Sequence, residues 1–205
     1  MSRYVLATNN PGKVKEIKPL FEQIGLELIC LADLGLSFEP AETGSTFEAN
    51  AIQKATETLN FLKENGHNNM TVLSDDSGLC INKLDGLPGV DSANYMGRET
   101  PYPERNANIL NLMSNTKGTK DRTARFECVI ACVRPDESYQ ICYGTIHGEI
   151  AQQIQGVSGF GYDPIFFVPE FGKTMAELTP EEKSKISHRG KAIRAMLEVL
   201  KNERN

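Results

Sequence analysis

The chain has 205 residues, a formal net charge of −5 at pH 7, 40% hydrophobic residues and 24% charged residues. These values are ordinary for a globular protein, and they exclude a global basic field that would draw the chain to nucleic acid. No apolar run approaches the ~18–20 residues that a membrane-spanning helix needs, and the apolar stretch after Met1 is too short for a signal peptide. The composition therefore predicts one domain, residues 1–205, in the cytoplasm.

In the first half of the chain, short apolar runs alternate with amphipathic stretches. The predicted elements are a strand 4–7, a helix 13–24, a strand 26–31, an acidic loop 37–44 and a helix from 47 to about 64. Pro19 conflicts with the first helix because a mid-helix proline removes a hydrogen bond. The pattern Ser45-Thr46-Phe47-Glu48 is typical of a capping box and supports the second helix.

The second half predicts more strands than helices. The predicted elements are strands 71–74 and 79–82, a helix 104–114, strands 123–133 and 139–150, a short strand 164–168, and helices that start after Thr179 and after Ser187. Both faces of 126–133 are apolar, which is typical of a central strand. The long hairpin indicates a mixed sheet, and the fold class is therefore α/β with a mixed β-sheet flanked by helices.

Five cysteines occur, an odd number, and no Cys-x-x-Cys pair is present. Cys128 and Cys132 lie in one predicted strand, which separates them by roughly 13 Å at ~3.3 Å per residue, too far for a disulfide. We therefore expect free thiols in a reducing compartment.

The most informative segment is Val72–Cys80, in which an apolar run ends at Asp75 and Asp76. Two adjacent carboxylates at the end of a buried strand repel each other and lose hydration, so a cation is expected to offset the cost. A divalent metal with oxygen ligands is one candidate. The alternative is an ordinary tight turn, because Asp, Ser and Gly favour turns.

The segment Thr8–Lys13 lies between the first predicted strand and helix. Such a turn presents free backbone N–H groups, the positive end of a helix dipole and the Lys13 charge, a suitable cradle for phosphate. It is not a Walker A loop, because Ala7 and Val14 stand where that motif requires glycine and Ser or Thr. The alternative is a polar turn with a solvated lysine.

Two further segments carry candidate binding groups. Phe160 and Tyr162 lie in a glycine-rich loop beside Asp163, where aromatic rings can stack on a nucleobase or serve as core anchors. Several cations and His188 gather around a helix start near residues 183–191, which suits a bound anion or, alternatively, a solvated basic face. No His-Glu-x-x-His, Gly-x-Ser-x-Gly or zinc ligand set is present.

The ordered set of these motifs resembles the inosine-triphosphate pyrophosphatase family, from Tyr4 to about Leu200. The motifs are Thr8–Lys13, Glu42-Thr43-Gly44, Ser74–Gly78, Phe160–Pro164 and Glu182-Lys183-Ser184-x-x-Ser187-His188-Arg189. The resemblance implies an elongated fold of two lobes with a central cleft, and a homodimer. It also implies Mg²⁺-dependent hydrolysis of non-standard purine nucleoside triphosphates (ITP, dITP, XTP) to the monophosphate and pyrophosphate.

The resemblance also implies roles for individual residues. Asp76 would be the general base and a metal ligand, and Glu42 a second metal ligand. Substrate would be bound by Thr8, Asn9, Asn10, Pro11, Gly12, Lys13, Ser77, Phe160, Gly161, Tyr162, Asp163, Lys183, His188 and Arg189. Phe160, Gly161, Tyr162 and Asp163 would wall the base pocket.

The chain departs from the family pattern at two places. Ala49 stands where the family usually has glutamate, so Glu42 or Glu48 must suffice for the metal. Asn94 stands where the family usually has arginine, which removes any salt bridge that the arginine made. Two alternative functions are a non-catalytic nucleotide-binding or sensor protein and a pyrophosphatase for modified pyrimidine nucleotides.

Overall fold

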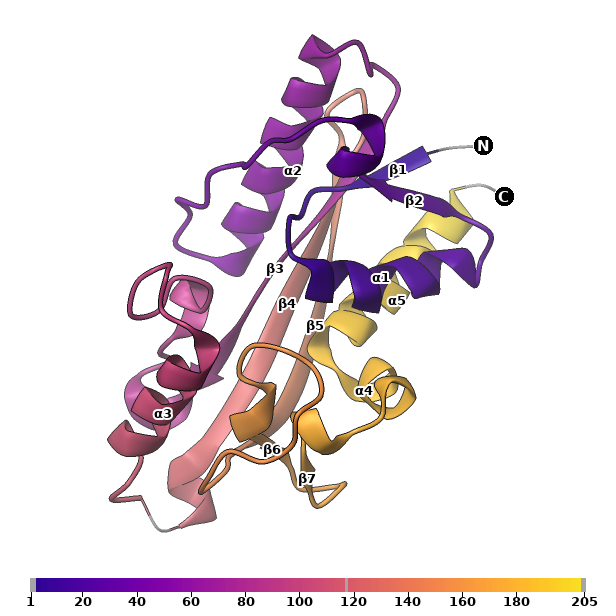
Figure 1. The fold of residues 1–205 in the computed structure, drawn as a ribbon. Coiled ribbons are helices and arrows are strands. Elements are labelled where there is room, and N and C mark those ends of the chain that lie inside the picture. The colour runs from indigo at the N-terminus through magenta and orange to yellow at the C-terminus, as the bar shows by residue number, and fades with distance from the viewer. Residues whose placement is uncertain (1–2, 117, 204–205) are drawn as a thin grey trace. The chain divides into compact units, whose positions relative to one another are not determined.

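The computed structural model describes residues 3–116 and 118–203, and Figure 1 shows its ribbon. The chain divides into two compact units. Unit 1 comprises Met1–Asp76, Cys128–Gly144 and Arg189–Asn205, and unit 2 comprises Ser77–Glu127 and Thr145–His188. None of the helices in the described ranges is long and apolar enough to cross a membrane. The single domain, the elongated shape and the central cleft stay predictions.

The described helices and strands follow the predicted order, most of them with shifted ends, and the two strands predicted at 71–74 and 79–82 form one strand. The helices are α1 (Pro11–Glu22), α2 (Phe47–Glu64), α3 (Tyr102–Leu112), α4 (Pro180–Ile186) and α5 (His188–Asn202). The strands are β1 (Arg3–Leu6), β2 (Glu27–Cys30), β3 (Thr71–Ile81), β4 (Thr123–Val133), β5 (Tyr139–Ile150), β6 (Phe166–Val168) and β7 (Lys173–Thr174). The bounds of β4 and β5 match the prediction, and β7 was not predicted.

The seven strands form one sheet in the order β2-β1-β3-β4-β5-β6-β7. β1 pairs in parallel with β2 and β3, whereas β6 pairs antiparallel with β5 and β7. The sheet is therefore mixed, as predicted, and β4 occupies its middle position, as its two apolar faces indicate. The α/β fold class is confirmed.

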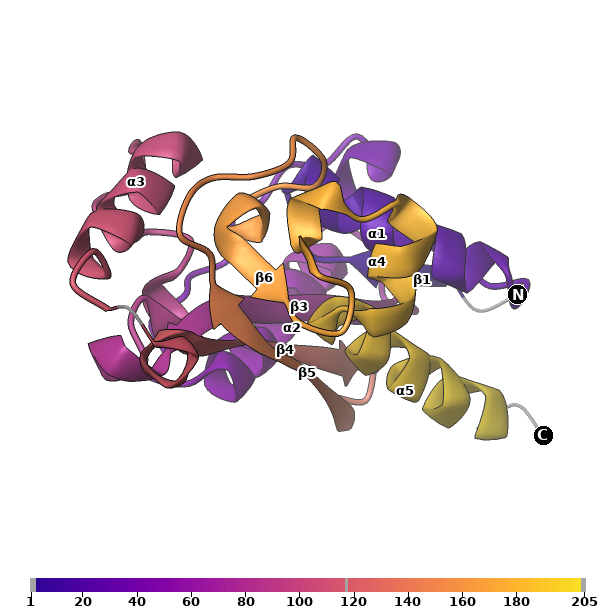
Figure 2. The ribbon, with the colours of Figure 1, turned by 90° about the horizontal axis from the view of Figure 1, so that it is seen from below.

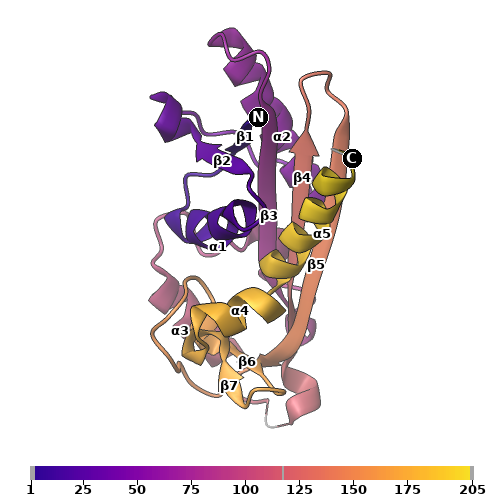
Figure 3. The ribbon, with the colours of Figure 1, turned by 90° about the vertical axis from the view of Figure 1, so that its right-hand side faces the viewer.

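In unit 1, helices pack on both sides of the strands (Figure 3). Leu6 and Leu73 lie in one buried cluster with Phe21 of α1 and Ile193 of α5. Ser74, the neighbour of Leu73, points the other way and donates a hydrogen bond to the carbonyl of Ala51 in α2, at 2.5 Å. α1 and α5 therefore cover one face of β3, and α2 covers the other.

Unit 2 has its own buried cluster, which joins Leu79 of β3, Ile109 of α3, Phe126 of β4 and Phe166 of β6. In Figure 2 the loop that follows β5 passes between α3 and β6. The buried guanidinium of Arg122 donates to the carbonyls of residues 113, 116, 150 and 151, and so ties this loop to the end of α3.

The predicted turn at Asp75 and Asp76 is wrong, because β3 continues through both residues to Ile81. Neighbouring cations neutralise the two carboxylates, as described below, so the strand can accommodate them without a turn. Two details of the helix starts also differ. Thr46, not Ser45, caps α2 through its side chain, and Asn10 caps α1, which begins at Pro11. α1 runs on through Pro19.

Candidate active site

Asp75 and Asp76 project to opposite faces of β3. Successive side chains of a strand alternate between its faces. Asp75 therefore lies on the side of Leu73, where α1 and α5 pack, and Asp76 lies on the side of Ser74, where α2 packs. The repulsion expected between the two carboxylates is thus reduced, and each carboxylate has its own environment.

Asp75 is the centre of a buried ion-pair network. Its carboxylate oxygens bind Lys13 Nζ at 3.0 Å and Arg189 Nε at 3.1 Å, and Arg189 also binds Glu16 at 2.5 Å. Burial opposes ionisation of Asp75, but the two cations outweigh it and hold the pKa of this carboxyl well below its usual range. Asp75 is therefore a permanent anion that fixes two cations from α1 and α5.

Asp76 belongs to a second network, in which a lysine joins two carboxylates. Lys54 Nζ lies 2.7 Å from Glu42 Oε1 and 3.4 Å from Asp76 Oδ1, and Asn50 Nδ2 donates to Asp76 Oδ2 at 3.0 Å. Burial raises the pKa of Asp76 despite Lys54, which makes this carboxylate a better proton acceptor than Asp75. Burial opposes the charge of Lys54, but Asp76, Asp75 and Glu42 raise its pKa.

The segment that carries Glu42 is packed closely on α2. Asn50 Oδ1 accepts the N–H of Gly44 at 2.7 Å. A Cβ on Gly44 would lie 2.8 Å from both Asn50 Oδ1 and Ala49 Cβ, so a larger residue would push the segment away from the helix. Asn50 therefore orients Asp76 through its amide nitrogen and the Glu42 segment through its amide oxygen.

The residues present fit a divalent metal ion with oxygen ligands. Glu42 and Asp76 both face one cation, the ammonium of Lys54. Mg²⁺ commonly takes one or two carboxylates and completes its octahedral coordination with water and substrate phosphate. Within residues 3–116 and 118–203 no group of three or more His, Cys, Asp or Glu side chains could hold an ion. Glu48 is bound instead to the hydroxyl of Tyr143.

In the turn Thr8–Lys13, the backbone N–H groups were expected to be free to bind phosphate, but the structure shows several of them hydrogen-bonded. The N–H groups of Gly12 and Lys13 donate to the Asn10 side chain, and the N–H of Asn10 donates to Thr8 Oγ1, so these amides are not free. Asn9 donates to the carbonyl of Phe38. The Lys13 side chain is only 15% exposed, so the alternative of a solvated lysine is wrong. Lys13 and the helix N-terminus remain as the groups that favour an anion.

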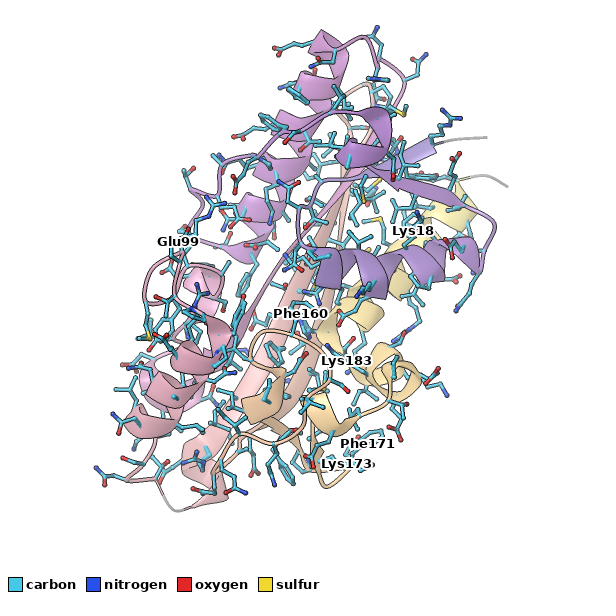
Figure 4. All side chains as sticks on the ribbon, in the orientation of Figure 1. Lys18, Glu99, Phe160, Phe171, Lys173 and Lys183 are labelled. Carbon is cyan, nitrogen blue, oxygen red and sulfur yellow. The ribbon has the colours of Figure 1, made fainter. Side chains whose placement is uncertain are left out.

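Unit 2 holds a second cluster, formed by the glycine-rich loop and α4. Asp163 Oδ2 binds Lys183 Nζ at 2.6 Å and accepts the N–H of Phe160 at 2.8 Å. Lys183 also lies over the half-buried ring of Phe160, with its ammonium 5.0 Å from the ring centre, and Figure 4 labels both residues. Gly159 has a φ of +77°, and a Cβ there would lie 2.2 Å from Asp163 Oδ2, so the loop requires glycine.

Other predicted binding residues of unit 2 are mostly buried. The Tyr162 hydroxyl donates to the carbonyl of Ser92 at 2.8 Å, and burial raises the pKa of this phenol. The ring of His188 stacks on Phe126 with the ring centres 4.7 Å apart. Ser77 is half-buried and follows Asp76 in β3. Tyr162 and His188 are anchors of the core, and their contact with substrate stays a prediction.

Sequence reasoning missed Lys54 and Glu16. Lys54 follows Asn50 by four residues and therefore shares its face of α2, and Glu16 follows Lys13 by three residues on α1. These spacings were visible in the sequence. The anion expected near the cations of residues 183–191 is, in this structure, supplied by the protein itself, through Asp163 and Asp75.

Comparison with known proteins gives consistent matches along the chain. A family model described as the Ham1 family matches residues 4–199. The dITP/XTP pyrophosphatase of Bacillus subtilis is 45% identical over 98% of this chain and 98% of its own length. The protein of the same name from Thermus thermophilus is 46% identical over 98% and 92%. The solved structure of the Staphylococcus aureus Ham1 protein has 42% identity and a TM-score of 0.84, and the match covers 98% of this chain and 100% of that one.

Proposed function

Since this chain belongs to the Ham1 family, we propose that it is a pyrophosphatase of non-standard purine nucleoside triphosphates. Its substrates are dITP, XTP and ITP, its products are the nucleoside monophosphate and pyrophosphate, and its metal ion is Mg²⁺. The observation that carries the proposal is the convergence of Glu42 and Asp76 on one cation, Lys54, at a place where burial raises the pKa of Asp76.

Asp76 and Glu42 would hold the metal ion, and Asp76 would act as the general base. A bound Mg²⁺ supplies polarisation of a phosphate oxygen and lowers the pKa of a bound water. Asp76 takes the proton of the attacking water, whose oxygen bonds to the α-phosphorus. The bond from that phosphorus to the bridging oxygen breaks, and pyrophosphate leaves with the electron pair. Asn50 keeps Asp76 oriented toward Lys54 during this step.

The cations of unit 1 offset the charge of the substrate. A nucleoside triphosphate carries about four negative charges, which require preorganised positive groups. Lys13 and Lys54 are held in place by Asp75 and by the Glu42–Asp76 pair, so little reorganisation is needed when phosphate binds. Arg189 is buried between Asp75 and Glu16 and would act mainly by fixing Asp75.

Recognition of the base is assigned to the cluster in unit 2. The half-buried ring of Phe160 offers a surface on which a purine can stack. Lys183 offers a donor to a keto oxygen, and Asp163 fixes both the lysine and the backbone of Phe160. A keto purine satisfies such a donor, whereas an amino group leaves it unpaired.

One assay tests the proposal. The purified chain is incubated with dITP, XTP, ITP, ATP, GTP and modified pyrimidine triphosphates, with Mg²⁺ or with EDTA, and the release of pyrophosphate is measured. We expect rapid release from dITP, XTP and ITP only when Mg²⁺ is present. Binding without hydrolysis would identify a nucleotide sensor, and preference for a modified pyrimidine would identify a different pyrophosphatase. Either result would contradict the proposal.

A further inference from the structure

Two side chains of α2, Gln53 and Glu57, hold the backbone on both sides of Glu42. Glu57 Oε2 accepts the N–H of Ala41 at 2.8 Å. Gln53 Oε1 accepts the N–H of Thr43 at 3.3 Å and the Thr43 hydroxyl at 3.1 Å. The residue before Glu42 and the residue after it are therefore both tied to the helix.

The two side chains are also joined to each other. Gln53 Nε2 donates to Glu57 Oε1 at 2.8 Å, which their spacing of four residues on one helix face permits. Glu57 accepts through both oxygens, and Gln53 accepts through its oxygen and donates through its nitrogen. All of these hydrogen bonds are therefore donated toward Glu57, directly from the N–H of Ala41 and, through Gln53, from Thr43.

The same face of α2 carries the groups that meet Asp76. Asn50 and Lys54 lie on this face, and they contact Asp76 from the helix while Lys54 also contacts Glu42. Gln53 and Glu57 bind the backbone N–H groups on either side of Glu42. The side chain of Glu42 itself is 31% exposed. α2 therefore holds Asp76 through Asn50 and Lys54, and it holds Glu42 both through Lys54 and through the backbone beside Glu42.

We propose that Gln53 and Glu57 are positioning residues, which hold Glu42 at the separation from Asp76 that one divalent ion requires. This inference rests on the proposed role of Glu42 as a metal ligand. Groups that orient metal ligands typically change metal affinity by 10–100-fold when they are removed. The pair does not touch the reacting atoms. Its loss should therefore lower the affinity for the metal ion more than it lowers the affinity for the nucleotide or the rate of the chemical step.

The experiment compares Gln53→Ala, Glu57→Ala and the exchanged double variant Gln53→Glu/Glu57→Gln with the wild-type chain. Alanine suits a helix, and both positions are half-buried, so these variants are expected to fold. In the exchanged variant the new carboxylate accepts from Thr43 and from the new amide, whose oxygen accepts from Ala41, so every hydrogen bond is restored. Glu64→Ala, at the exposed end of α2, is the matched control.

Three quantities are measured. Hydrogen exchange needs neither metal nor substrate, and we expect it to become roughly tenfold faster at the amide of residue 43 in Gln53→Ala and at the amide of residue 41 in Glu57→Ala. The affinity for Mn²⁺ alone is measured from the electron paramagnetic resonance signal of the free ion. This affinity should fall about tenfold or more in the alanine variants. The Mg²⁺ concentration for half-maximal dITP hydrolysis should rise by a similar factor, while kcat at saturating Mg²⁺ and the KM for dITP change little. The exchanged variant should restore all three.

The outcomes separate this inference from the proposed function. A wild-type chain that hydrolyses dITP with Mg²⁺, together with alanine variants that match Glu64→Ala in metal binding, would overturn the inference alone. A lower kcat, a higher KM and a lower metal affinity, all changed by the same factor and not rescued by the exchanged variant, would indicate a general loss of structure. That result would also overturn the inference. A wild-type chain with no metal dependence would overturn the metal role of Glu42, and this inference with it.

Discussion

Asp75 and Asp76 are consecutive residues whose carboxylates lie on opposite faces of β3 and meet different cations. Asp75 binds Lys13 and Arg189, and Asp76 binds Asn50 and Lys54. The pKa of Asp75 lies below its usual range, because its cations outweigh the effect of burial, and burial raises that of Asp76. One strand thus supplies a fixed anion to one face and a proton acceptor to the other.

The first prediction concerns the stability of Asp75→Asn. Removal of one member of a buried ion pair typically costs ~3–5 kcal/mol, because the remaining charges stay buried without compensation. We expect the free energy of unfolding at pH 7 to fall by about 3 kcal/mol, at the lower end of that range because Arg189 retains Glu16. Urea denaturation followed by circular dichroism measures the change.

The pH dependence of that loss has a defined sign. The pKa of Asp75 is lower in the folded chain than the ~3.9 of an unfolded aspartate, so its contribution is complete above that value and disappears as the pH falls. The difference between wild type and Asp75→Asn should therefore be constant from pH 8 to 5 and shrink below about pH 4. A difference that grows on acidification would contradict the ion-pair assignment.

The second prediction concerns the activity of Asp76→Asn. An amide cannot take a proton from water and is a poor replacement for a carboxylate at a metal ion, so kcat should fall by several orders of magnitude. The far-ultraviolet circular dichroism spectrum should match that of the wild type. Asp136→Asn, an exposed substitution in the turn between β4 and β5, is the control. Turnover of Asp76→Asn within a few-fold of wild type would rule out its role as base.

The third prediction concerns Lys54→Met. Without the ammonium, Glu42 and Asp76 face each other without a cation, and added Mg²⁺ can take its place. We expect Mg²⁺ to raise the Tm of this variant by about 2–4 °C more than it raises that of the wild type, which corresponds to ~1 kcal/mol at this chain length. Lys63 lies on the same helix as Lys54 and pairs at the surface with Glu137 of the turn between β4 and β5, and Lys63→Met should respond as the wild type does. Equal shifts in all three chains would contradict the arrangement.

Local sequence signals predicted much of the fold. The two apolar faces of β4, the helix start after Thr179 and the capping pattern before α2 each act within one element, and the corresponding elements formed. The Asp75–Asp76 turn failed because strand formation there depends on cations that come from α1, α2 and α5, distant in the sequence. No local pattern shows that such partners will arrive.

The candidate site was predicted only in part, again because its partners are distant in the sequence. Lys13 and Arg189 were identified as anion binders, but the anions that they meet are carboxylates of the chain itself, Asp75 for both and also Glu16 for Arg189. Lys54 lies on the buried face of α2, whereas from the sequence a lysine is expected to keep its charged end in solvent. Only the fold brings its ammonium to Glu42, which comes from a loop on the N-terminal side of α2.

The fourth prediction is that the chain forms a homodimer with a two-fold axis, as the family resemblance implies. Sedimentation equilibrium at micromolar concentration should give about twice the chain mass of 22.7 kDa. Asn94, which is exposed, stands where the family usually has arginine. A monomer at that concentration would contradict the prediction, and Asn94→Arg would then show whether the missing arginine accounts for it.

The fifth prediction concerns selection of the base. A 6-keto purine presents an acceptor where adenine presents an amino donor, and a buried donor left unpaired costs ~1–3 kcal/mol. Two or three mismatched groups correspond to a preference for ITP over ATP of about 10²–10⁴-fold in kcat/KM. Among the donors, Lys183 lies over the ring of Phe160 and is fixed by Asp163.

The variant Lys183→Met removes this donor but leaves Asp163 buried without its cation, which also weakens the fold. The double variant Lys183→Met/Asp163→Asn removes the charge as well, and its amide oxygen can still accept the N–H of Phe160. We expect the double variant to regain the stability that the single variant loses, while the preference for ITP over ATP stays about tenfold or more below that of the wild type. Measurement of kcat/KM for ITP and ATP, beside urea denaturation, separates the two effects. A double variant with the full wild-type preference would show that Lys183 only supports the loop, and equal kcat/KM values for ITP and ATP in the wild type would show that position 6 is not read.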